Sequence, residues 1–235
     1  MNGFKKIISI QQPEAFPWLG FFDKIRQVDE VVLLDSVQFK KRYFENRNRV
    51  RTANGWTWIT VPVITKGRYH QKIRDVEIDN TRPWRKKILG TLEKNYRRGP
   101  GWKRFSEKIT EIIVKNHQRL VDLNLEVITF LLKALSLERP TIRSSDLDLS
   151  SSGSRLILDI CKARKATTYL SGAFGRNYLD LSSFSKAGIE VRFQEFRHPI
   201  YRQIHKPFLP GMSALDLIFS DPEHIPNLWK TTEQG

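Results

Sequence analysis

Uncharged amides at the end of a strand are the first residues in this sequence that suggest chemistry. Gln11 and Gln12 follow a β-branched run over residues 7–10, which favours a buried strand. Each glutamine amide both donates and accepts hydrogen bonds, so the pair suits recognition of a polar ligand. Asp35 ends the next apolar run, over residues 31–34, and adds a carboxylate. If both runs are parallel strands, these three side chains stand at one sheet edge.

The segment between these two runs has the spacing of a helix. Its apolar residues fall on one helical face at intervals of three and four: Trp18, Phe21, Phe22, Ile25 and Val28. A β-α-β unit is therefore predicted over residues 7–34, and ligands usually meet such units at the carboxyl ends of their strands. We expect the aromatic face of the helix to be core packing.

Arginines alternate along the first arm of a predicted hairpin over residues 46–63. An Asn-Gly dipeptide gives the turn signal, and a period of two places Arg47, Arg49 and Arg51 on one face. Two interpretations stay open, a solvated hairpin face and an anion clamp. Arginine is favoured where phosphate or carboxylate is bound by two parallel hydrogen bonds. We take Arg47 and Arg49, with Asn48 between them, as candidate ligands of an anionic substrate.

A glycine-rich turn belongs to a second predicted β-α-β unit. Its elements are a strand over residues 166–170, a helix over 179–187 and a strand over 189–196. A glycine-rich turn that leads into a helix N-terminus can seat an anion on backbone N–H groups. The spacing differs from that of a dinucleotide fingerprint or a P-loop. The substrate-binding candidates in this turn are Ser171, Gly172, Gly175, Asn177 and Tyr178.

His198 is the candidate general base, because a histidine titrates close to neutral pH. Tyr201 stands in the same loop and is a further candidate for substrate contact, and Gln11 completes that set. The chain contains no HExxH, no paired-cysteine motif and no GxSxG, and its five histidines are scattered. The lone Cys161 falls in an apolar helical pattern and is expected to be buried. No metal site is predicted.

The charge balance favours an anionic partner. Lys and Arg number 40 against 25 acids, a formal charge of +15. Candidate partners are an anionic small molecule such as a nucleotide sugar, or an acidic acyl-carrier protein. Nucleic acid ranks last, because no recognised nucleic-acid module is present. No apolar run approaches the ~20 residues of a membrane span, and the N-terminus lacks a secretory pattern, so a cytoplasmic location is expected.

The middle of the chain is predicted to be helical. Helices are expected from about residue 83, from about 102 and over 120–135, after an edge strand over residues 73–78. The expected fold class is α/β, with a doubly wound, largely parallel sheet, a β-hairpin and a helical insert at about 80–140. We treat residues 1–235 as one domain.

The order of several motifs resembles that of the WbqC-like protein family. The matching stretches are ISIQQPEAFPWLGFFDKI, VVLLDSVQFKKRYFENRNRV, TVPV, YLSGAFGRNYLD, FRHPIYRQ and SALDLIF, which together cover nearly the whole chain. Members of that family commonly carry HQP where this chain has QQP, and two acids where this chain has Asp35-Ser36. The resemblance implies a role in bacterial O-antigen or other surface-polysaccharide assembly.

The resemblance leads to one main hypothesis and two alternatives. The main hypothesis is an acyl or aminoacyl transferase that modifies a nucleotide-linked amino sugar. Arg47, Arg49 and the glycine-rich turn would hold phosphate, and the reacting end would be lined by Gln12, Asp35 and His198. The alternatives are a non-catalytic nucleotide-sugar or carrier-binding protein, and a nucleic-acid-binding protein. The topology is similar to that of the nucleotidyltransferase group, but the HxGH adenylate-binding signature is absent, so the sequence identifies no cofactor.

Overall fold

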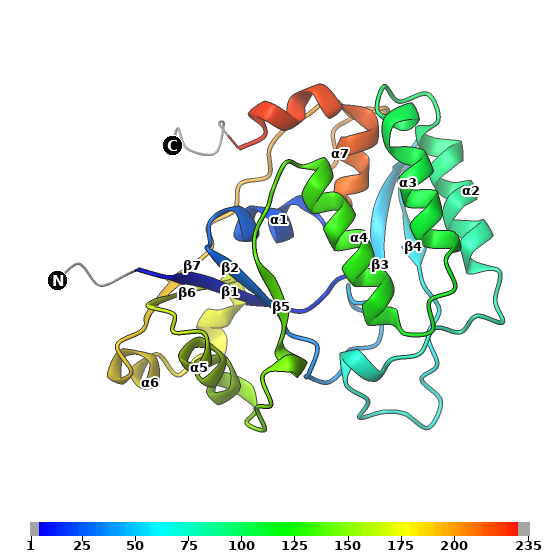
Figure 1. Cartoon of the computed structure of the whole chain (residues 1–235). Coiled ribbons are helices and arrows are strands. Elements are labelled where there is room, and N and C mark those ends of the chain that lie inside the picture. Colours follow the sequence, from blue (N-terminus) through cyan, green and yellow to red (C-terminus); the bar gives the residue numbers. More distant parts are fainter. Residues whose placement is uncertain (1–4, 230–235) are drawn as a thin grey trace. The chain divides into compact units, whose positions relative to one another are not determined.

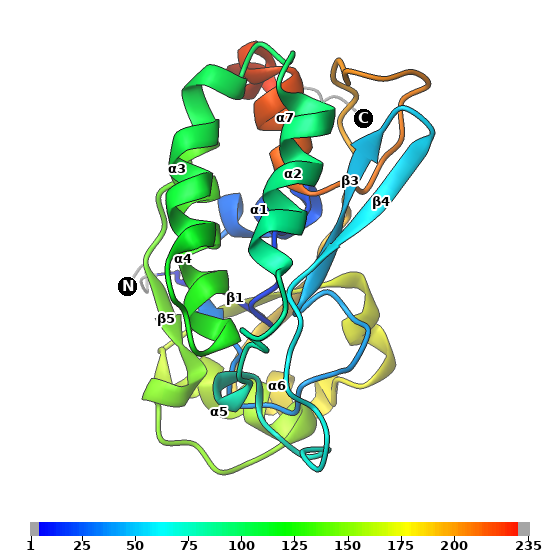
Figure 2. The same ribbon diagram turned by 90° about the vertical axis from the view of Figure 1, so that its right-hand side faces the viewer.

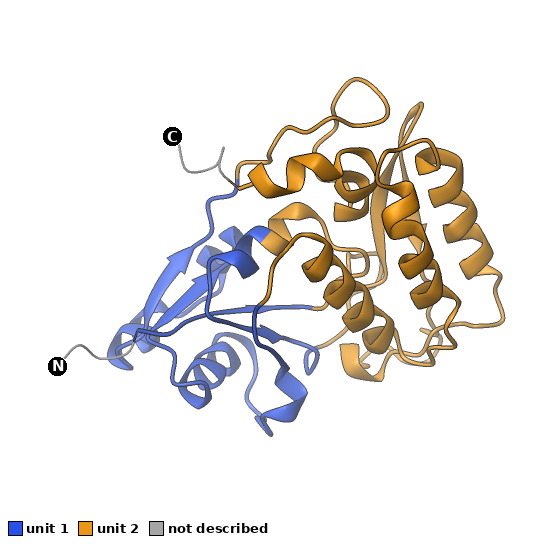
Figure 3. Cartoon of the chain, turned by 45° about the horizontal axis from the view of Figure 1, so that its top comes forward, with its two compact units in different colours: residues 1–12, 23–37, 139–196 blue, residues 13–22, 38–138, 197–235 orange. Residues whose placement is uncertain are grey.

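The computed structural model describes residues 5–229 (Figure 1). Residues 1–4 and 230–235 lie outside the described part of the chain. The N-terminal stretch in which no secretory pattern was expected therefore begins outside it. The chain separates into two compact units, each built from three stretches (Figure 3). Unit 1 holds residues 1–12, 23–37 and 139–196, and unit 2 holds residues 13–22, 38–138 and 197–235. The expectation of a single domain over residues 1–235 stays a prediction.

Unit 1 is built around a five-stranded sheet in which every neighbouring pair of strands is parallel. The strand order is β5-β2-β1-β6-β7. The strands are β1 (Ile7–Gln11), β2 (Glu30–Leu33), β5 (Thr141–Arg143), β6 (Thr168–Ser171) and β7 (Glu190–Phe193). Helices lie on both sides of the sheet, namely α1 (Leu19–Arg26), α5 (Gly153–Ala163) and α6 (Leu181–Lys186) (Figure 1). The predicted α/β fold with a largely parallel sheet is confirmed.

The core of unit 1 forms because alternate residues of its central strands are apolar. Ile8 and Ile10 of β1 pack with α5 and α6 in one buried cluster, and a strand period of two turns both side chains to the same face. Tyr169 of β6 stacks on Phe184 of α6 with ring centroids 6.0 Å apart. The periodicity that predicted these strands therefore also accounts for the face on which the helices lie.

Strand β5 was not predicted from the sequence. It contains three residues, too few for a period of two to be recognised. The pairing begins at Pro140, whose carbonyl accepts a hydrogen bond from the N–H of Val31 at 2.9 Å. Pro140 therefore leads into an edge strand of the sheet as well as following the helical middle of the chain, which is consistent with the preference of proline for edges.

Unit 2 combines an antiparallel hairpin with four helices. The hairpin strands are β3 (Arg47–Thr52) and β4 (Gly55–Thr60), and the helices are α2 (Trp84–Tyr96), α3 (Trp102–Val114), α4 (Leu120–Ala134) and α7 (Ala214–Ser220) (Figure 2). Helices α2, α3 and α4 fall within the predicted insert. The turn lies one residue earlier than expected, at Ala53-Asn54, and Gly55 pairs with Thr52. Gly55 has a φ of +121°, which favours glycine there.

The edge strand predicted over residues 73–78 is wrong. Ile73–Asp75 forms one turn of 3-10 helix, closed by a hydrogen bond from the N–H of Asp75 to the carbonyl of Lys72 at 2.9 Å. Only isolated bridges follow it, at Glu77 and Ile78. The buried side chains are Ile73, Val76 and Ile78. The buried residues 73 and 76 are three apart, as in a 3-10 turn, and not two apart as in a strand. The alternation of apolar and charged residues therefore led to the wrong prediction.

Backbone hydrogen bonds join the three stretches of unit 2. Ala15 N–H donates to the carbonyl of Phe44 at 2.9 Å. In the same way, Ala214 N–H donates to Pro17 at 2.8 Å, and Ser213 N–H donates to Arg49 at 2.8 Å. The hairpin and α7 are thus both tied to the segment that follows β1 in the sequence. No helix within residues 5–229 combines the length and the apolar character needed to cross a bilayer.

A buried carboxylate anchors α7 to the rest of unit 2. Asp216 accepts hydrogen bonds from the hydroxyl groups of Tyr96 at 2.8 Å and Tyr201 at 2.6 Å, and from the Gln203 amide at 2.8 Å. Burial raises the pKa of Asp216, and these three donors and the nearby Arg51 oppose the shift. Tyr96 in turn accepts the backbone N–H of Arg51 at 2.7 Å. The network therefore links α2, α7 and the hairpin.

We predict that Asp216→Asn lowers the free energy of unfolding by about 3 kcal/mol. The new amide NH₂ would face hydroxyl donors, and the buried Arg51 would lose its counter-charge. Urea denaturation followed by circular dichroism measures the change. The control is Glu107→Gln on the exposed side of α3, which should stay within about 0.5 kcal/mol of the parent. Equal stability of the two variants would contradict a structural role for the network.

Candidate functional site

The residues selected from the sequence fall into two groups, one in each compact unit. In unit 1 the structure places Gln11, Gln12, Asp35, Ser171, Gly172, Gly175, Asn177 and Tyr178. In unit 2 it places Arg47, Asn48, Arg49, His198 and Tyr201. Each group is described within its own unit, and the expectation that Gln12, Asp35 and His198 share one cleft stays a prediction.

Asp35 lies two residues after the end of β2, and its carboxylate is held by the last residue of β5 and the two serines that follow it. Its side chain is fully buried. It accepts hydrogen bonds from Arg143 Nε at 2.7 Å, from Ser144 Oγ at 3.1 Å, and from both the backbone N–H and the hydroxyl of Ser145, at 3.0 and 2.9 Å. The neighbouring Ser36 Oγ lies 2.8 Å from Ser144 Oγ. These contacts give Asp35 a structural task, and its catalytic role stays a prediction.

The two glutamines at the end of β1 differ in exposure. Gln11 is 8% exposed, and its backbone carbonyl accepts the N–H of Leu34 at 2.8 Å. Gln12 is half-buried and is the last residue of its stretch of unit 1. Their position at the carboxyl end of a central parallel strand is confirmed, because β1 pairs with both β2 and β6. Their binding and catalytic roles stay predictions.

The glycine-rich turn does not lead directly into a helix, so that part of the prediction is wrong. Residues Ala173–Asn177 form a 3-10 helix, and α6 begins only at Leu181. The Asp180 carboxylate caps α6 by accepting the backbone N–H of Ser183 at 3.3 Å, so an acidic side chain occupies the expected anion seat. A Cβ on Gly175 would lie 2.0 Å from Ser171 Oγ. Close packing therefore accounts for this glycine.

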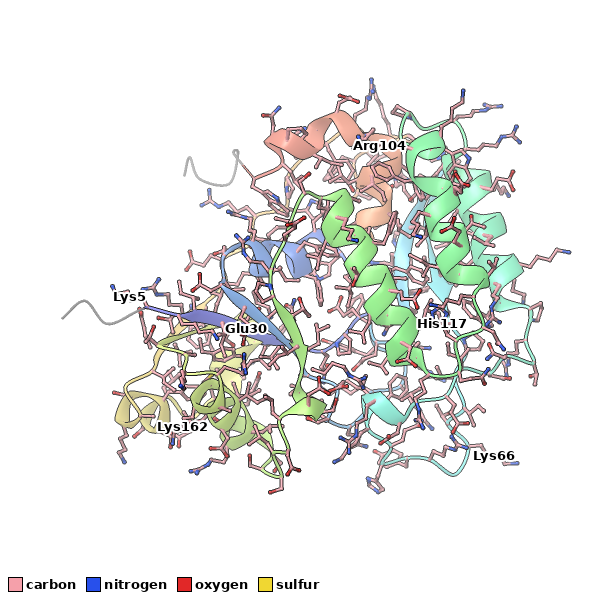
Figure 4. All side chains as sticks on the ribbon, in the orientation of Figure 1. Lys5, Glu30, Lys66, Arg104, His117 and Lys162 are labelled. Atoms are coloured by element: carbon pink, nitrogen blue, oxygen red, sulfur yellow. The ribbon has the colours of Figure 1, made fainter. Side chains whose placement is uncertain are left out.

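Glu30, a buried acid of unit 1, forms ion pairs with two basic side chains. The Glu30 carboxylate, labelled in Figure 4, pairs with Arg164 through hydrogen bonds of 2.7 and 2.8 Å and with Lys6 at 3.0 Å. The hydrogen bonds from Arg164 lower the pKa of Glu30, against the opposing effect of burial. Two of the buried acids of unit 1, Asp35 and Glu30, are therefore held by cationic partners.

In unit 2, the alternating arginines of β3 do share one face of the hairpin, but they differ in their contacts. The Arg47 guanidinium lies 4.2 Å from the Trp58 ring centroid, and that of Arg49 lies 5.4 Å from the Trp56 centroid. Arg51 is 1% exposed and donates to the carbonyls of Thr52, Gly55 and Pro207. Arg47 and Arg49 remain half-buried on the face. Arg51 is a structural residue.

Four aromatic rings continue this face and form what we call the aromatic cluster. Successive ring centroids are 5.2, 6.1 and 5.5 Å apart along the series Tyr43, Phe44, Trp58 and Trp56. Tyr43 is 46% exposed and Trp56 44% exposed. Exposed rings beside guanidinium groups can stack on a sugar or a base and hold a nearby phosphate. The arrangement supports the anion-clamp interpretation in chemical terms.

His198, Tyr201 and Asn48 have well-defined polar contacts. His198 Nδ1 lies 2.8 Å from the Pro199 carbonyl, so this nitrogen is the donor. Burial lowers the pKa of His198, which keeps the ring neutral at pH 7 with Nε2 as the proton acceptor. Tyr201 is 5% exposed and donates to Asp216. The Asn48 Oδ1 accepts the N–H of Arg49 at 2.8 Å.

Glu45 is a site candidate that the sequence reasoning missed. Its side chain is fully buried, and neither carboxylate oxygen makes a hydrogen bond of ordinary geometry with any of residues 5–229. The backbone N–H groups of Glu45 itself and of Lys40 lie near enough to favour the charged form, but too far or too poorly aligned for such a bond. Burial raises the pKa of Glu45 to about 6, although the Lys40 ammonium and the backbone N–H groups of Glu45 and Lys40 oppose the shift. A lone acid between Phe44 and Asn46, inside a basic stretch, was the available signal. A buried carboxylate near neutrality is suited to proton transfer.

The main chain at Glu45 is held in place by Asn124 of α4. The Asn124 Nδ2 group donates to the Glu45 carbonyl at 2.8 Å and to the Pro13 carbonyl at 3.0 Å. Asn46 next to Glu45 donates its own amide to the Val61 carbonyl at 2.8 Å. The backbone is therefore fixed on both sides, while the Glu45 carboxylate is left without a hydrogen bond from the described residues. Within residues 5–229, no three His, Cys, Asp or Glu side chains gather as a metal site.

Comparison with known proteins identifies the family. The chain belongs to the WbqC-like protein family, whose model matches residues 12–226. It is also similar to the uncharacterized protein Rv1507c of Mycobacterium tuberculosis, with 33% identity over 231 residues, which is 97% of this chain and 100% of that protein. No solved structure gives a significant match. The resemblance seen in the sequence motifs is confirmed.

We predict that Glu45→Gln removes a pH dependence of stability. The folded pKa of about 6 exceeds the value of 4.5 for an exposed glutamate, so folding binds a proton between these values. The stability of the parent protein should fall by about 2 kcal/mol as the pH rises from below 4.5 to above 6, at 1.36 kcal/mol per pKa unit.

Chemical denaturation at pH 4.5, 6 and 7.5 measures this effect. Glu45→Gln should match the parent protein at low pH and exceed its stability at pH 7.5. Glu107→Gln, on the exposed side of α3, is the control and should follow the parent curve. A constant difference between Glu45→Gln and the parent at every pH would contradict the raised pKa.

Proposed function

We propose that this member of the WbqC-like family is a cytoplasmic bacterial transferase that transfers an acyl or aminoacyl group to a nucleotide-linked amino sugar. Its product would enter O-antigen or related surface-polysaccharide assembly. The observation that carries the proposal is the Glu45 carboxylate, buried without a hydrogen-bond partner among the described residues and with a pKa of about 6. Native structures rarely leave a buried polar group in this state without a functional reason.

The chemistry of N-acylation gives this carboxylate a task. The sugar amine attacks the carbonyl carbon of an activated ester or thioester, a C–N bond forms, and the leaving group departs with its bonding electrons. The attacking nitrogen must lose one proton, which passes to the carboxylate of Glu45. With a pKa of about 6 the carboxylate is mostly ionised at pH 7, so it is ready to accept that proton.

The charge of unit 2 supports an anionic substrate. Unit 2 contains 27 of the 40 basic residues and 15 of the 25 acidic ones, so it carries +12 of the formal charge of +15. Arg47 and Arg49 stand half-buried on the hairpin face beside the aromatic cluster. Guanidinium groups in this setting bind phosphate well, because they are weakly hydrated and rigid. The nucleotide-linked form of the sugar supplies that phosphate.

His198 is a second candidate base in unit 2. Its neutral ring and donating Nδ1 leave Nε2 with the chemistry of a proton acceptor. The two candidates differ in their expected effects, because only the base that receives the amine proton controls the chemical step. Replacing the other residue changes substrate placement and therefore KM more than kcat.

We predict that Glu45→Gln lowers kcat for acyl transfer by 10²–10⁴-fold, the usual range for loss of a general base. The assay follows formation of the N-acylated sugar by mass spectrometry, with a UDP-linked amino sugar and acyl thioesters as substrates. Activity of the parent should fall as the pH drops through about 6, because protonated Glu45 cannot accept a proton. Glu107→Gln should retain parental kcat.

Three other outcomes have distinct meanings. Full activity of Glu45→Gln with loss of activity in His198→Ala assigns the base to His198. Ligand retained without product in single-turnover assays identifies a non-catalytic binding protein. No binding of any nucleotide-linked sugar overturns the proposed function.

We further predict that Arg47→Ala and Arg49→Ala each weaken binding of the nucleotide sugar by roughly 1.5–3 kcal/mol, the value of a hydrogen bond to a charged group. Isothermal titration calorimetry measures the affinity. Arg155→Ala on the exposed side of α5 in unit 1 serves as the charge-matched control. Parental affinity in both hairpin variants, with the fold intact, would reduce these arginines to surface residues.

A further inference from the structure

A second polar region of unit 2 lies between the tip of the hairpin and α2. It is a groove of about 710 Å³, within the size range of small-molecule sites. Its lining combines three lysines with uncharged polar residues and one tryptophan, and it contains no acidic side chain. The residues that matter for the argument are Asn54, Trp58, Lys86, Lys87 and Lys94.

Two of the three lysines of this groove stand where the helix dipole does not favour a cation. Lys86 and Lys87 lie in the first turn of α2, which contains no acidic residue. The helix dipole places positive potential at that end, so each cation there costs roughly 0.3–1 kcal/mol. Both side chains are exposed, and neither has an ion-pair partner within the described part of the chain. A bound anion would remove this repulsion.

A groove between α3 and α4 provides the comparison. It also contains three lysines, Lys108, Lys115 and Lys133, but it includes Glu111 and Glu126. Lys108 pairs with Glu111 at 2.7 Å, and Lys115 pairs with Glu126. Two of the three lysines are therefore paired with acids in this groove, whereas the groove at the hairpin tip has three lysines and no acidic side chain in its lining.

Trp58 adds an aromatic surface to the groove at the hairpin tip. It is half-buried, lines the groove and belongs to the aromatic cluster through its contact with Trp56. Any of the nucleic-acid bases can stack on an indole ring, because every base has a flat aromatic face. One tryptophan and a few lysines match one base and a short run of phosphates, and the volume suits a ligand of that size.

We infer that this groove binds the nucleoside end of the substrate, with Trp58 stacking on the base and with Lys86, Lys87 and Lys94 holding the phosphate next to the nucleoside. The phosphate next to the sugar is left to Arg47 and Arg49, and Arg47 lies 4.2 Å from the Trp58 ring centroid. The inference rests on the proposed function and adds a subsite to it. Lys87 and Lys94 stand seven residues apart on α2, which is about 10 Å along the helix. Their long flexible side chains can converge on one phosphate group from both sides.

The test is calorimetric titration of the full chain with UDP, ADP, pyrophosphate and uridine at low salt. The double variant Lys86→Gln/Lys87→Gln should weaken UDP and ADP binding by tenfold or more. The matched control Lys108→Gln/Lys115→Gln removes the same charge from paired lysines and should stay within about twofold of the parent. An equal loss of affinity in both double variants would mean that only the overall positive charge matters, and it would overturn the inference.

A second pair of variants tests stacking. Trp58→Leu should weaken UDP and ADP binding by about tenfold and leave pyrophosphate binding unchanged, whereas Trp56→Leu should have little effect, because Trp56 does not line the groove. Circular dichroism confirms the fold of both variants. Equal binding of pyrophosphate and UDP, or unchanged UDP binding by Trp58→Leu, would overturn the nucleotide assignment.

Two further outcomes separate this inference from its premise. A single-stranded oligonucleotide that binds the groove lysines far more tightly than UDP would replace the nucleotide with nucleic acid and overturn the inference. Nucleotide binding without acyl transfer leaves the groove in place and removes the proposed function. Acyl transfer with an unchanged KM in Lys86→Gln/Lys87→Gln would support the proposed function and overturn the role of the groove.

Discussion

The side-chain amide of Asn124 is the contact on which the organisation of unit 2 depends. One NH₂ group serves two carbonyls, those of Pro13 and Glu45, which belong to different stretches of the chain. All three residues lie in the interior or at its margin. A buried carbonyl without a donor costs about 1–3 kcal/mol. The segment that leads into the hairpin therefore has little freedom to move away from α4, and Glu45 is carried into the core with it.

Among the described residues of unit 2, two acids are buried, and burial raises the pKa of both, but their hydrogen bonding differs. Asp216 receives three donors and lies near Arg51, so its charge is compensated within the fold. Glu45 has no hydrogen bond from the described residues and is shifted toward its neutral form. Burying a carboxylate without a partner opposes folding. The contrast argues that Asp216 is held for stability, whereas the environment of Glu45 is suited to proton transfer.

The sequence predicted those features that a local pattern specifies. The four long parallel strands and the helices of the insert follow from the spacing of apolar residues, and the hairpin follows from its turn dipeptide. Strand β5 was too short to recognise, and the turn at residues 73–75 imitated a strand in its spacing. Asp216 and the lysines of α2 gave no local signal, and Glu45 gave only that of a lone acid in a basic stretch. Their environments depend on which distant segments pack around them, which a single sequence does not state.

The distribution of charge connects these local features to function. In unit 1, Glu30 and Asp35 are paired with cations, and little charge is left over. Unit 2 keeps an excess of cations, places two lysines at the unfavourable end of α2, and buries one acid without a hydrogen bond from the described residues. The lysines at the start of α2 and the buried carboxylate each lower the stability of the fold. Native proteins usually keep such unfavourable features at functional sites. The proposed substrate, a nucleotide-linked amino sugar, would relieve both: its phosphate would neutralise the lysines, and its attacking amine would give one proton to Glu45.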